Sequence, residues 1–160
     1  MENNLHLHGL TLPIPAGFHV MDKEEWSRMK LLADGEGTGL SDPGRHMVVT
    51  LGWKQAGGFS AALLSAKDLA KSMEKQICKA MASLGCRSEG VKTRTIGGRE
   101  AHGARYRYTA QGTDMTGESW VVKEKKEIWY LHGYIHTELL EVSLPVWEEM
   151  LDSITIEPSN

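Results

Sequence analysis

The sequence has 160 residues, of which 41% are hydrophobic and 24% are charged, and its formal net charge is −3. This is the composition of a soluble globular protein, and the length suits a single domain over residues 1–160. No block of Lys and Arg provides the charge that nucleic-acid binding needs, and no apolar run is long enough to span a membrane. The first residues lack the basic and apolar parts of a signal peptide, which predicts a cytoplasmic protein.

The first third of the chain predicts short elements. Leucines alternate loosely over residues 5–14, which indicates one or two short strands. Asp22 and Glu25 have the spacing of a capping box and predict the start of a short helix. Residues 34–44 contain four glycines and a proline and are interpreted as a surface loop, and residues 45–54 as a strand.

The clearest helix is predicted from Ser65 to Leu84. Ser65 is a suitable N-cap, and Gly85 is a suitable residue to end the helix. Apolar residues recur at steps of three and four, whereas lysines occupy the opposite side, so the helix is expected to pack one face on a sheet. The apolar positions are Leu69, Met73, Ile77, Ala80, Met81 and Leu84. A strand is predicted to follow over residues 86–96.

Residues 96–138 are predicted to form three antiparallel strands. The turn signals Gln111-Gly112 and Lys125-Lys126 separate them. Because two-residue loops fix the register, residue 110 is expected opposite residue 113, and residue 124 opposite residue 127. This register places Arg105 opposite Glu118 and Arg99 opposite Glu124, and such opposite charges favour the pairing.

The same register divides the side chains between two faces. One face is apolar and is interpreted as core, with Trp120, Val122, Trp129, Leu131 and Ile135. We call the other the Tyr/His face. It is the candidate binding surface and carries His102, Tyr106, Tyr108, Tyr130, His132, Tyr134 and His136.

A last helix is predicted to begin with Ser143 as its N-cap, with Pro145 in its first turn. Its buried side would carry Trp147, Met150, Leu151 and Ile154, and the tail to residue 156 would add a strand. Helices packed on an antiparallel sheet define the α+β class.

No catalytic or metal-binding set emerges from the spacing. His132 and His136 would lie about 13 Å apart along one strand, and His102 two strands away from them, so these histidines are too far apart to share one ion and no metal and no cofactor are predicted. Cys78 and Cys86 lack metal spacing and are interpreted as reduced thiols near a helix end. Ser119 faces His132, but no acidic residue orients the histidine, which favours a structural hydrogen bond over a nucleophile.

Five short segments resemble the PsbP-like superfamily, which includes bacterial DcrB-like proteins. They are Leu12–Phe18, Gly97–Ala101, Tyr106–Tyr108, Trp129–Tyr130 and Trp147–Ile154. The resemblance covers most of the chain and implies an α/β/α sandwich around an antiparallel sheet. It also implies a non-enzymatic role in binding other proteins.

The first hypothesis is therefore a non-catalytic module that binds a protein or peptide through the Tyr/His face. The alternative is a small hydrolase or a small-ligand-binding protein that uses the same face. A deep, closed pocket would favour the alternative, and a shallow groove the first hypothesis. A third interpretation is that a helix simply covers the Tyr/His face. The sequence also leaves a homodimer open.

Overall fold

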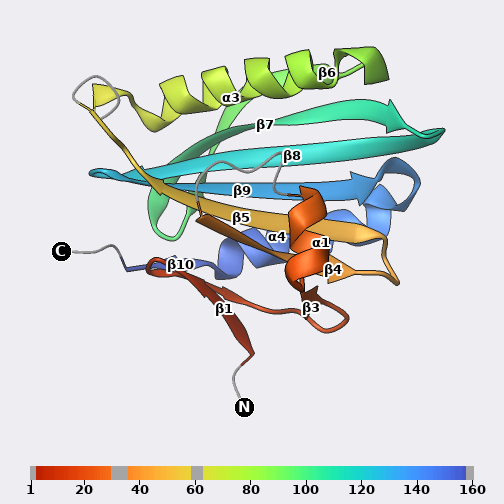
Figure 1. The fold of residues 1–160 in the computed structure, drawn as a ribbon, viewed down its shortest axis with the longest axis horizontal. Helices are drawn as coiled ribbons and strands as arrows, with labels where there is room; N and C mark the ends of the chain where they lie inside the picture. Colours follow the sequence, from red (N-terminus) through yellow and green to blue (C-terminus); the bar gives the residue numbers. More distant parts are fainter. Residues whose placement is uncertain (1–2, 30–35, 59–62, 158–160) are drawn as a thin grey trace.

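Two antiparallel sheets and their flanking helices make up this computed structural model, which describes residues 3–29, 36–58 and 63–157 (Figure 1). The large sheet has seven strands in the order β3-β4-β5-β9-β8-β7-β6, and the small sheet has the order β1-β2-β10. The strands are β1 Asn4–Leu7, β2 Leu10–Pro13, β3 His19–Val20, β4 Glu36–Asp42, β5 Met47–Gln55, β6 Arg87–Ile96, β7 Arg99–Ala110, β8 Thr113–Glu124, β9 Glu127–His136 and β10 Thr155–Ile156. The helices are α1 Lys23–Met29, α3 Ala66–Ala80 and α4 Leu140–Ser153, with short 3-10 turns η2 Ala82–Leu84 and η3 Thr137–Leu139.

The predicted register of the three-stranded segment is confirmed. Ala110 pairs with Thr113 across the β7–β8 turn, and Glu124 pairs with Glu127 across the β8–β9 turn. Gln111 and Gly112 both have positive φ, as the tight turns that match strand twist require. The turn residues thus set the alignment of two pairs of long strands.

Helix α3 packs on one face of the large sheet. The predicted Ser65 cap is confirmed as a full capping box with Asp68, although the helix ends at Ala80 and η2 continues the chain. Met73 is buried against Val121 and Ile128 of the sheet, whereas Ile77 is only partly buried. In Figure 1, α3 lies on the opposite side of the long strands from the small sheet.

Helix α4 packs on the other face, and its predicted buried side is confirmed. Trp147, Met150 and Leu151 join one cluster with all five residues of the predicted apolar face. Gly133 of β9 allows this contact, because a Cβ there would lie 3.0 Å from three ring atoms of Trp147. The sheet therefore lies between two helices, and the small sheet extends the α4 layer through Leu10 and Leu12.

The predicted surface loop over residues 34–44 is wrong, because β4 occupies Glu36–Asp42 and pairs with β5. The first two residues of the loop lie outside the described residues. Gly37 and Gly39 serve close packing: a Cβ at Gly37 would lie 2.4 Å from the Trp26 ring, and one at Gly39 would lie 2.6 Å from the Met21 sulfur. The glycines therefore belong to a strand that other side chains cover.

The predicted start of the last helix is also wrong. Helix α4 begins at Leu140, directly after η3, so Ser143 lies inside the helix and is fully buried. Its hydroxyl has no hydrogen-bond partner among the residues that the structure describes. Pro145 consequently lies beyond the first turn, where its missing N–H removes one helical hydrogen bond. The short 3-10 turn that links β9 to α4 leaves no room for a separate capping loop.

Candidate binding site

The structure brings the predicted Tyr/His face together on β7 and β9, but it buries the centre of that face. Tyr106 is 2% exposed, Tyr134 is 7% exposed and His132 is 8% exposed. The sequence left open whether this face is exposed or covered, and its centre, including His132, is covered. Helix α3 packs on this face through its contacts with Val121 and Tyr130, as the third interpretation required.

The buried centre is a connected hydrogen-bond network. The Ser119 hydroxyl lies 2.6 Å from Nδ1 of His132 and 3.1 Å from the Tyr106 hydroxyl. Tyr134 in turn bonds to Tyr106 and Thr50. Burial lowers the pKa of His132 to about 4 and raises the pKa of Tyr106, so both groups are neutral at pH 7.

The contacts of this network indicate that it stabilises the fold and does not catalyse a reaction. Ser119 is completely buried, so a substrate has no path to its hydroxyl. Within the described residues, no carboxylate bonds to His132 as the orienting group of a catalytic triad would. The Ser–His hydrogen bond instead satisfies polar groups that would otherwise be costly to bury.

The rest of the Tyr/His face is partly exposed, at His102, Tyr108, Tyr130 and His136. Both histidines among them already have partners. Nε2 of His102 lies 3.0 Å from Glu100, and the ring of His136 stacks on that of His46 with ring centroids 4.8 Å apart. No three His, Cys, Asp or Glu side chains gather into a possible metal site in the part of the chain that the structure describes.

On the opposite face, Glu118 joins helix α4 to the sheet. Its side chain is buried and accepts hydrogen bonds from the indole nitrogens of Trp120 at 2.7 Å and Trp147 at 2.9 Å. Nε of Arg105 donates a third at 2.9 Å. The predicted Arg105–Glu118 pair is thus confirmed, and the two tryptophans are additional partners that strand pairing alone does not predict.

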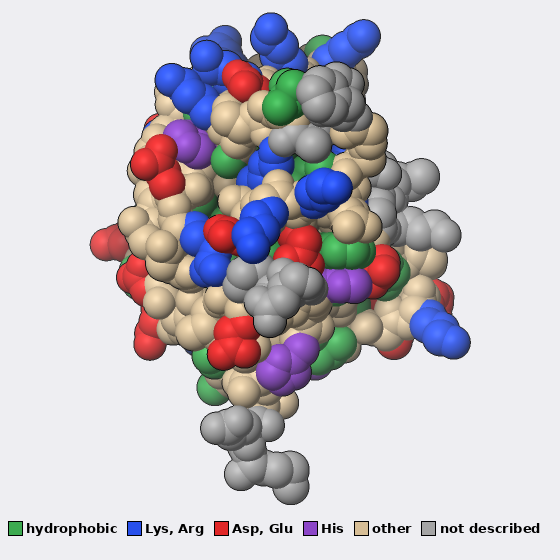
Figure 2. All heavy atoms as spheres, turned by 90° about the vertical axis from the view of Figure 1, so that its left-hand side faces the viewer, with side chains coloured by type: hydrophobic (Ala, Val, Ile, Leu, Met, Phe, Trp, Pro, Cys, Tyr) green, Lys and Arg blue, Asp and Glu red, His purple; other side chains and the backbone are tan. Residues whose placement is uncertain are grey.

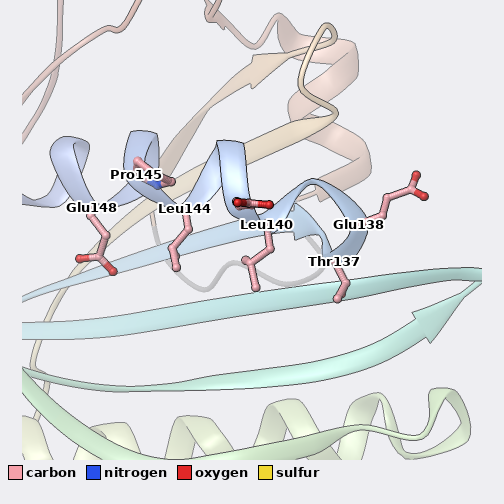
Figure 3. Close-up of a pocket in the computed structure, with 7 residues that line it drawn as sticks. Thr137, Glu138, Leu140, Leu144, Pro145 and Glu148 are labelled. Atoms are coloured by element: carbon pink, nitrogen blue, oxygen red, sulfur yellow. The ribbon is translucent and has the colours of Figure 1, made fainter.

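Two open hollows meet at Glu148 on one side of α4, and we call them together the α4 trough. The first has a volume of about 580 Å³ and is lined by Thr137, Glu138, Leu140, Glu141, Leu144, Pro145 and Glu148. Figure 3 shows Leu140, Leu144 and Thr137 pointing from the chain toward the neighbouring strands. The second, of about 400 Å³, continues past Glu148 to Trp120, Arg94 and Asp152.

The trough is apolar at its base and acidic at its rim. Residues 137–153 include five acidic residues and no Lys or Arg. Arg94 neutralises two of the five, because it lies 2.6 Å from both Glu148 and Asp152. Glu138 and Glu141 are exposed and form no ion pair with a described residue. They leave negative charge beside Leu140 and Leu144.

The opposite helix carries the opposite charge. Four exposed lysines lie on α3, namely Lys67, Lys71, Lys75 and Lys79. Figure 2 shows Lys and Arg side chains gathered at the top of the molecule, the end where Figure 1 places α3. The small net charge of the chain therefore conceals one basic and one acidic helix.

Sequence reasoning did not find the trough. The available signal was the run of five acids without a basic residue over residues 137–153. The predicted helix start at Ser143 leaves Leu140 and Glu141 outside the helix, so the helix pattern does not bring these two residues together with Glu148.

The architecture defines the chain as a protein of PsbP-like fold, as solved structures show. The solution structure of cyanobacterial PsbP (CyanoP) from Synechocystis sp. PCC 6803 matches with a TM-score of 0.66 and 11% identity, over 94% of this chain and 88% of that one. LpqN of Mycobacterium tuberculosis, described as involved in cell envelope biogenesis, matches with a TM-score of 0.65 and 17% identity, over 99% and 91%. The Ran-binding protein Mog1p of Saccharomyces cerevisiae matches with a TM-score of 0.57 and 9% identity, over 99% and 97%.

At such low sequence identities, these structural similarities show a shared fold and no shared function. No family model matches the chain, and no curated protein matches it. Among the described helices, none is both long and apolar enough to cross a membrane.

Proposed function

We propose that this chain is a non-catalytic module that binds a protein or peptide segment in the α4 trough. The observation that carries the proposal is an open, apolar base formed by Leu140 and Leu144 beside the exposed carboxylates of Glu138 and Glu141, which pair with no described residue. A shallow groove of this kind suits an extended segment, whereas enclosed pockets suit small ligands.

The expected ligand is a segment that combines apolar and basic side chains. Apolar side chains would cover Leu140 and Leu144, and a Lys or Arg would lie beside Glu138 or Glu141. Complementary charge mainly sets the rate and specificity of such an encounter, while the apolar contacts provide affinity.

The small-hydrolase alternative has less support. Its nucleophile would be Ser119, which is 0% exposed, and its base would be His132, whose pKa burial lowers to about 4. A general base works best with a pKa near the working pH. The Tyr/His face is likewise a weaker candidate for binding than the trough, because its three central residues are buried.

A protein partner is also consistent with the neighbouring structures. Mog1p, which has the same fold, is a Ran-binding protein. The identity between the chains is 9%, so this similarity supports the type of function and leaves the partner of this chain open.

The test uses three fluorescent peptides of equal length, which alternate Leu with Lys, Leu with Glu and Ser with Lys. The wild-type chain should bind the Leu–Lys peptide most tightly, because it alone matches both the base and the rim. The double variant Glu138→Lys/Glu141→Lys should weaken that binding at least tenfold, which is about 1.4 kcal/mol.

A matched control is Glu89→Lys/Glu157→Lys, which makes the same charge change at two exposed acids outside the trough. It should change the affinity less than about threefold at 0.15 M salt, where charges beyond about 8 Å are screened. Equal losses in both double variants would show only non-specific attraction and would contradict the proposal.

A further inference from the structure

Two cysteines meet where α3 ends and β6 begins. Cys78 lies in the last turn of α3, and Cys86 directly precedes Arg87, the first residue of β6. The chain turns between them through η2 and Gly85, whose φ of 73° is readily adopted only by glycine. The two sulfur atoms lie 3.2 Å apart, and both side chains are partly exposed.

We propose that Cys78 and Cys86 form a reversible intramolecular disulfide that fastens the end of α3 to β6. A disulfide bond is about 2.05 Å long, so the sulfurs need to approach by only about 1 Å from their present separation. Small side-chain rotations supply such a movement. This inference is independent of the proposed binding function, because it uses neither the α4 trough nor a partner.

The oxidant would be a low-molecular-weight disulfide such as oxidised glutathione. The thiolate of Cys78 attacks one glutathione sulfur, breaks its S–S bond and releases one reduced glutathione. Cys86 then loses its proton and its sulfur attacks the Cys78 sulfur of the mixed disulfide, which breaks the bond to glutathione and releases the second glutathione, protonated to its thiol. Two electrons and two protons thus pass from the protein to glutathione.

The order of the two steps follows from the surroundings of the thiols. Burial raises the pKa of Cys86 to about 12, so this thiol keeps its proton and is the poorer first nucleophile. Once Cys78 carries glutathione, the short distance gives Cys86 a high effective concentration for the second step. In a reducing compartment the pair remains as two thiols, and it closes when the glutathione pool becomes oxidised.

The bond would close a ring of nine residues, from Cys78 to Cys86. A ring of this size lowers the entropy of the unfolded chain enough to raise the unfolding temperature by about 5–10 °C for a chain of this length. The added restraint acts at the end of the helix that packs over Val121, so opening of this face should become rarer.

The experiment incubates the full chain with oxidised glutathione, blocks remaining thiols by alkylation in denaturant and measures the intact mass. The expected product is lighter than the reduced chain by two hydrogens and carries no alkyl group. Trypsin cleaves after Lys75, Lys79 and Arg87, so the bond would link peptide 76–79 to peptide 80–87. The unfolding temperature should rise as given above and return after dithiothreitol.

The control is the double variant Cys78→Ser/Cys86→Ser, whose unfolding temperature should not respond to the oxidant. Two alkylated thiols, a lasting glutathione adduct or a disulfide between two chains in the wild-type protein would each overturn the proposal. If the two peptides were linked but the unfolding temperature did not rise, the claim that the disulfide fastens α3 to β6 would be wrong. If the variant does not fold, the mass and peptide measurements on the wild-type chain still decide the outcome.

Discussion

Glu118 shows how a single side chain can hold two layers of the fold together. Replacing it by Gln removes the charge that faces Arg105 and replaces one of the two oxygens that accept bonds from Arg105, Trp120 and Trp147. Removing one partner of a buried ion pair leaves Arg105 without its main counter-charge, and only the partly exposed Glu148, at 3.9 Å, remains beside it. We therefore expect the free energy of unfolding to fall by roughly 3 kcal/mol. Urea denaturation followed by circular dichroism measures this loss.

Glu148→Gln is the matched control for this substitution. Its carboxylate pairs with Arg94 at 2.6 Å and lies 3.9 Å from Arg105, but it is 42% exposed, and pairs in contact with water contribute about 0–1 kcal/mol. If both variants lost the same free energy of unfolding, the burial of Glu118 would not make its interactions stronger than those of an exposed carboxylate.

His132 makes stability depend on pH. Its folded pKa of about 4 lies below the ordinary value of 6.5, so the unfolded chain binds more protons as the pH falls. The stabilisation is therefore complete above about pH 6.5, is lost as the pH falls from 6.5 to 4, and amounts to about 3 kcal/mol. We expect His132→Gln to have a correspondingly smaller loss of stability between pH 7 and pH 4.5 in urea denaturation. If the variant lost as much stability as the wild-type chain between pH 7 and pH 4.5, groups other than His132 would cause the loss.

At the scale of the element, the burial of α3 differs from the sequence expectation in a measurable way. Of the six apolar positions expected to pack on the sheet, only Met73 is buried, at 8% exposure, while Leu69, Ile77 and Met81 are partly exposed. Met73→Ala should therefore cost about 2–3 kcal/mol of unfolding free energy, near the lower end of the range for core methionines. Ile77→Ala should cost less, because part of its side chain already contacts water.

Thermal or urea unfolding of the two variants side by side tests this order. Ser72→Ala provides the reference, because Ser72 is an exposed residue of the same helix and alanine favours helix formation. An equal or larger cost at Ile77 would indicate that the helix is rotated toward that residue.

At the scale of the whole molecule, the two apolar clusters share the same strands. Trp120 and Val122 of β8 face the α4 cluster, whereas Val121 between them faces the α3 cluster. Disruption of either cluster therefore exposes the strands on which the other depends, and we propose that the chain unfolds as one domain.

The cooperative unit can be tested with two spectroscopic probes. Tryptophan fluorescence reports all five tryptophans, three of which, Trp120, Trp129 and Trp147, are buried on the α4 side, and far-ultraviolet circular dichroism reports all helices and strands. The two transitions should coincide, and Met73→Ala on the α3 side should shift both equally. A fluorescence transition that does not respond to Met73→Ala would separate the two faces into independent units.

Local patterns in the sequence predict those parts of the fold that depend on neighbouring residues. Turn residues fixed the register of β7, β8 and β9, since a two-residue loop aligns the strands that it joins. Capping groups at Asp22 and Ser65 located two helix starts. Alternation then divided the long strands correctly into a tryptophan face and a Tyr/His face.

Which of these surfaces water can reach depends on long-range packing and is seen only in the folded chain. Alternation shows that Tyr106, His132 and Tyr134 share a face, but it carries no information about what covers them, and α3 packs on that face. The glycines of β4 likewise give a local pattern that is typical of a loop. The reason for Gly37 is its contact with the Trp26 ring, which only the folded chain shows. The α4 trough depends on where a helix meets strands far away in the sequence, which is a long-range arrangement that no local pattern encodes.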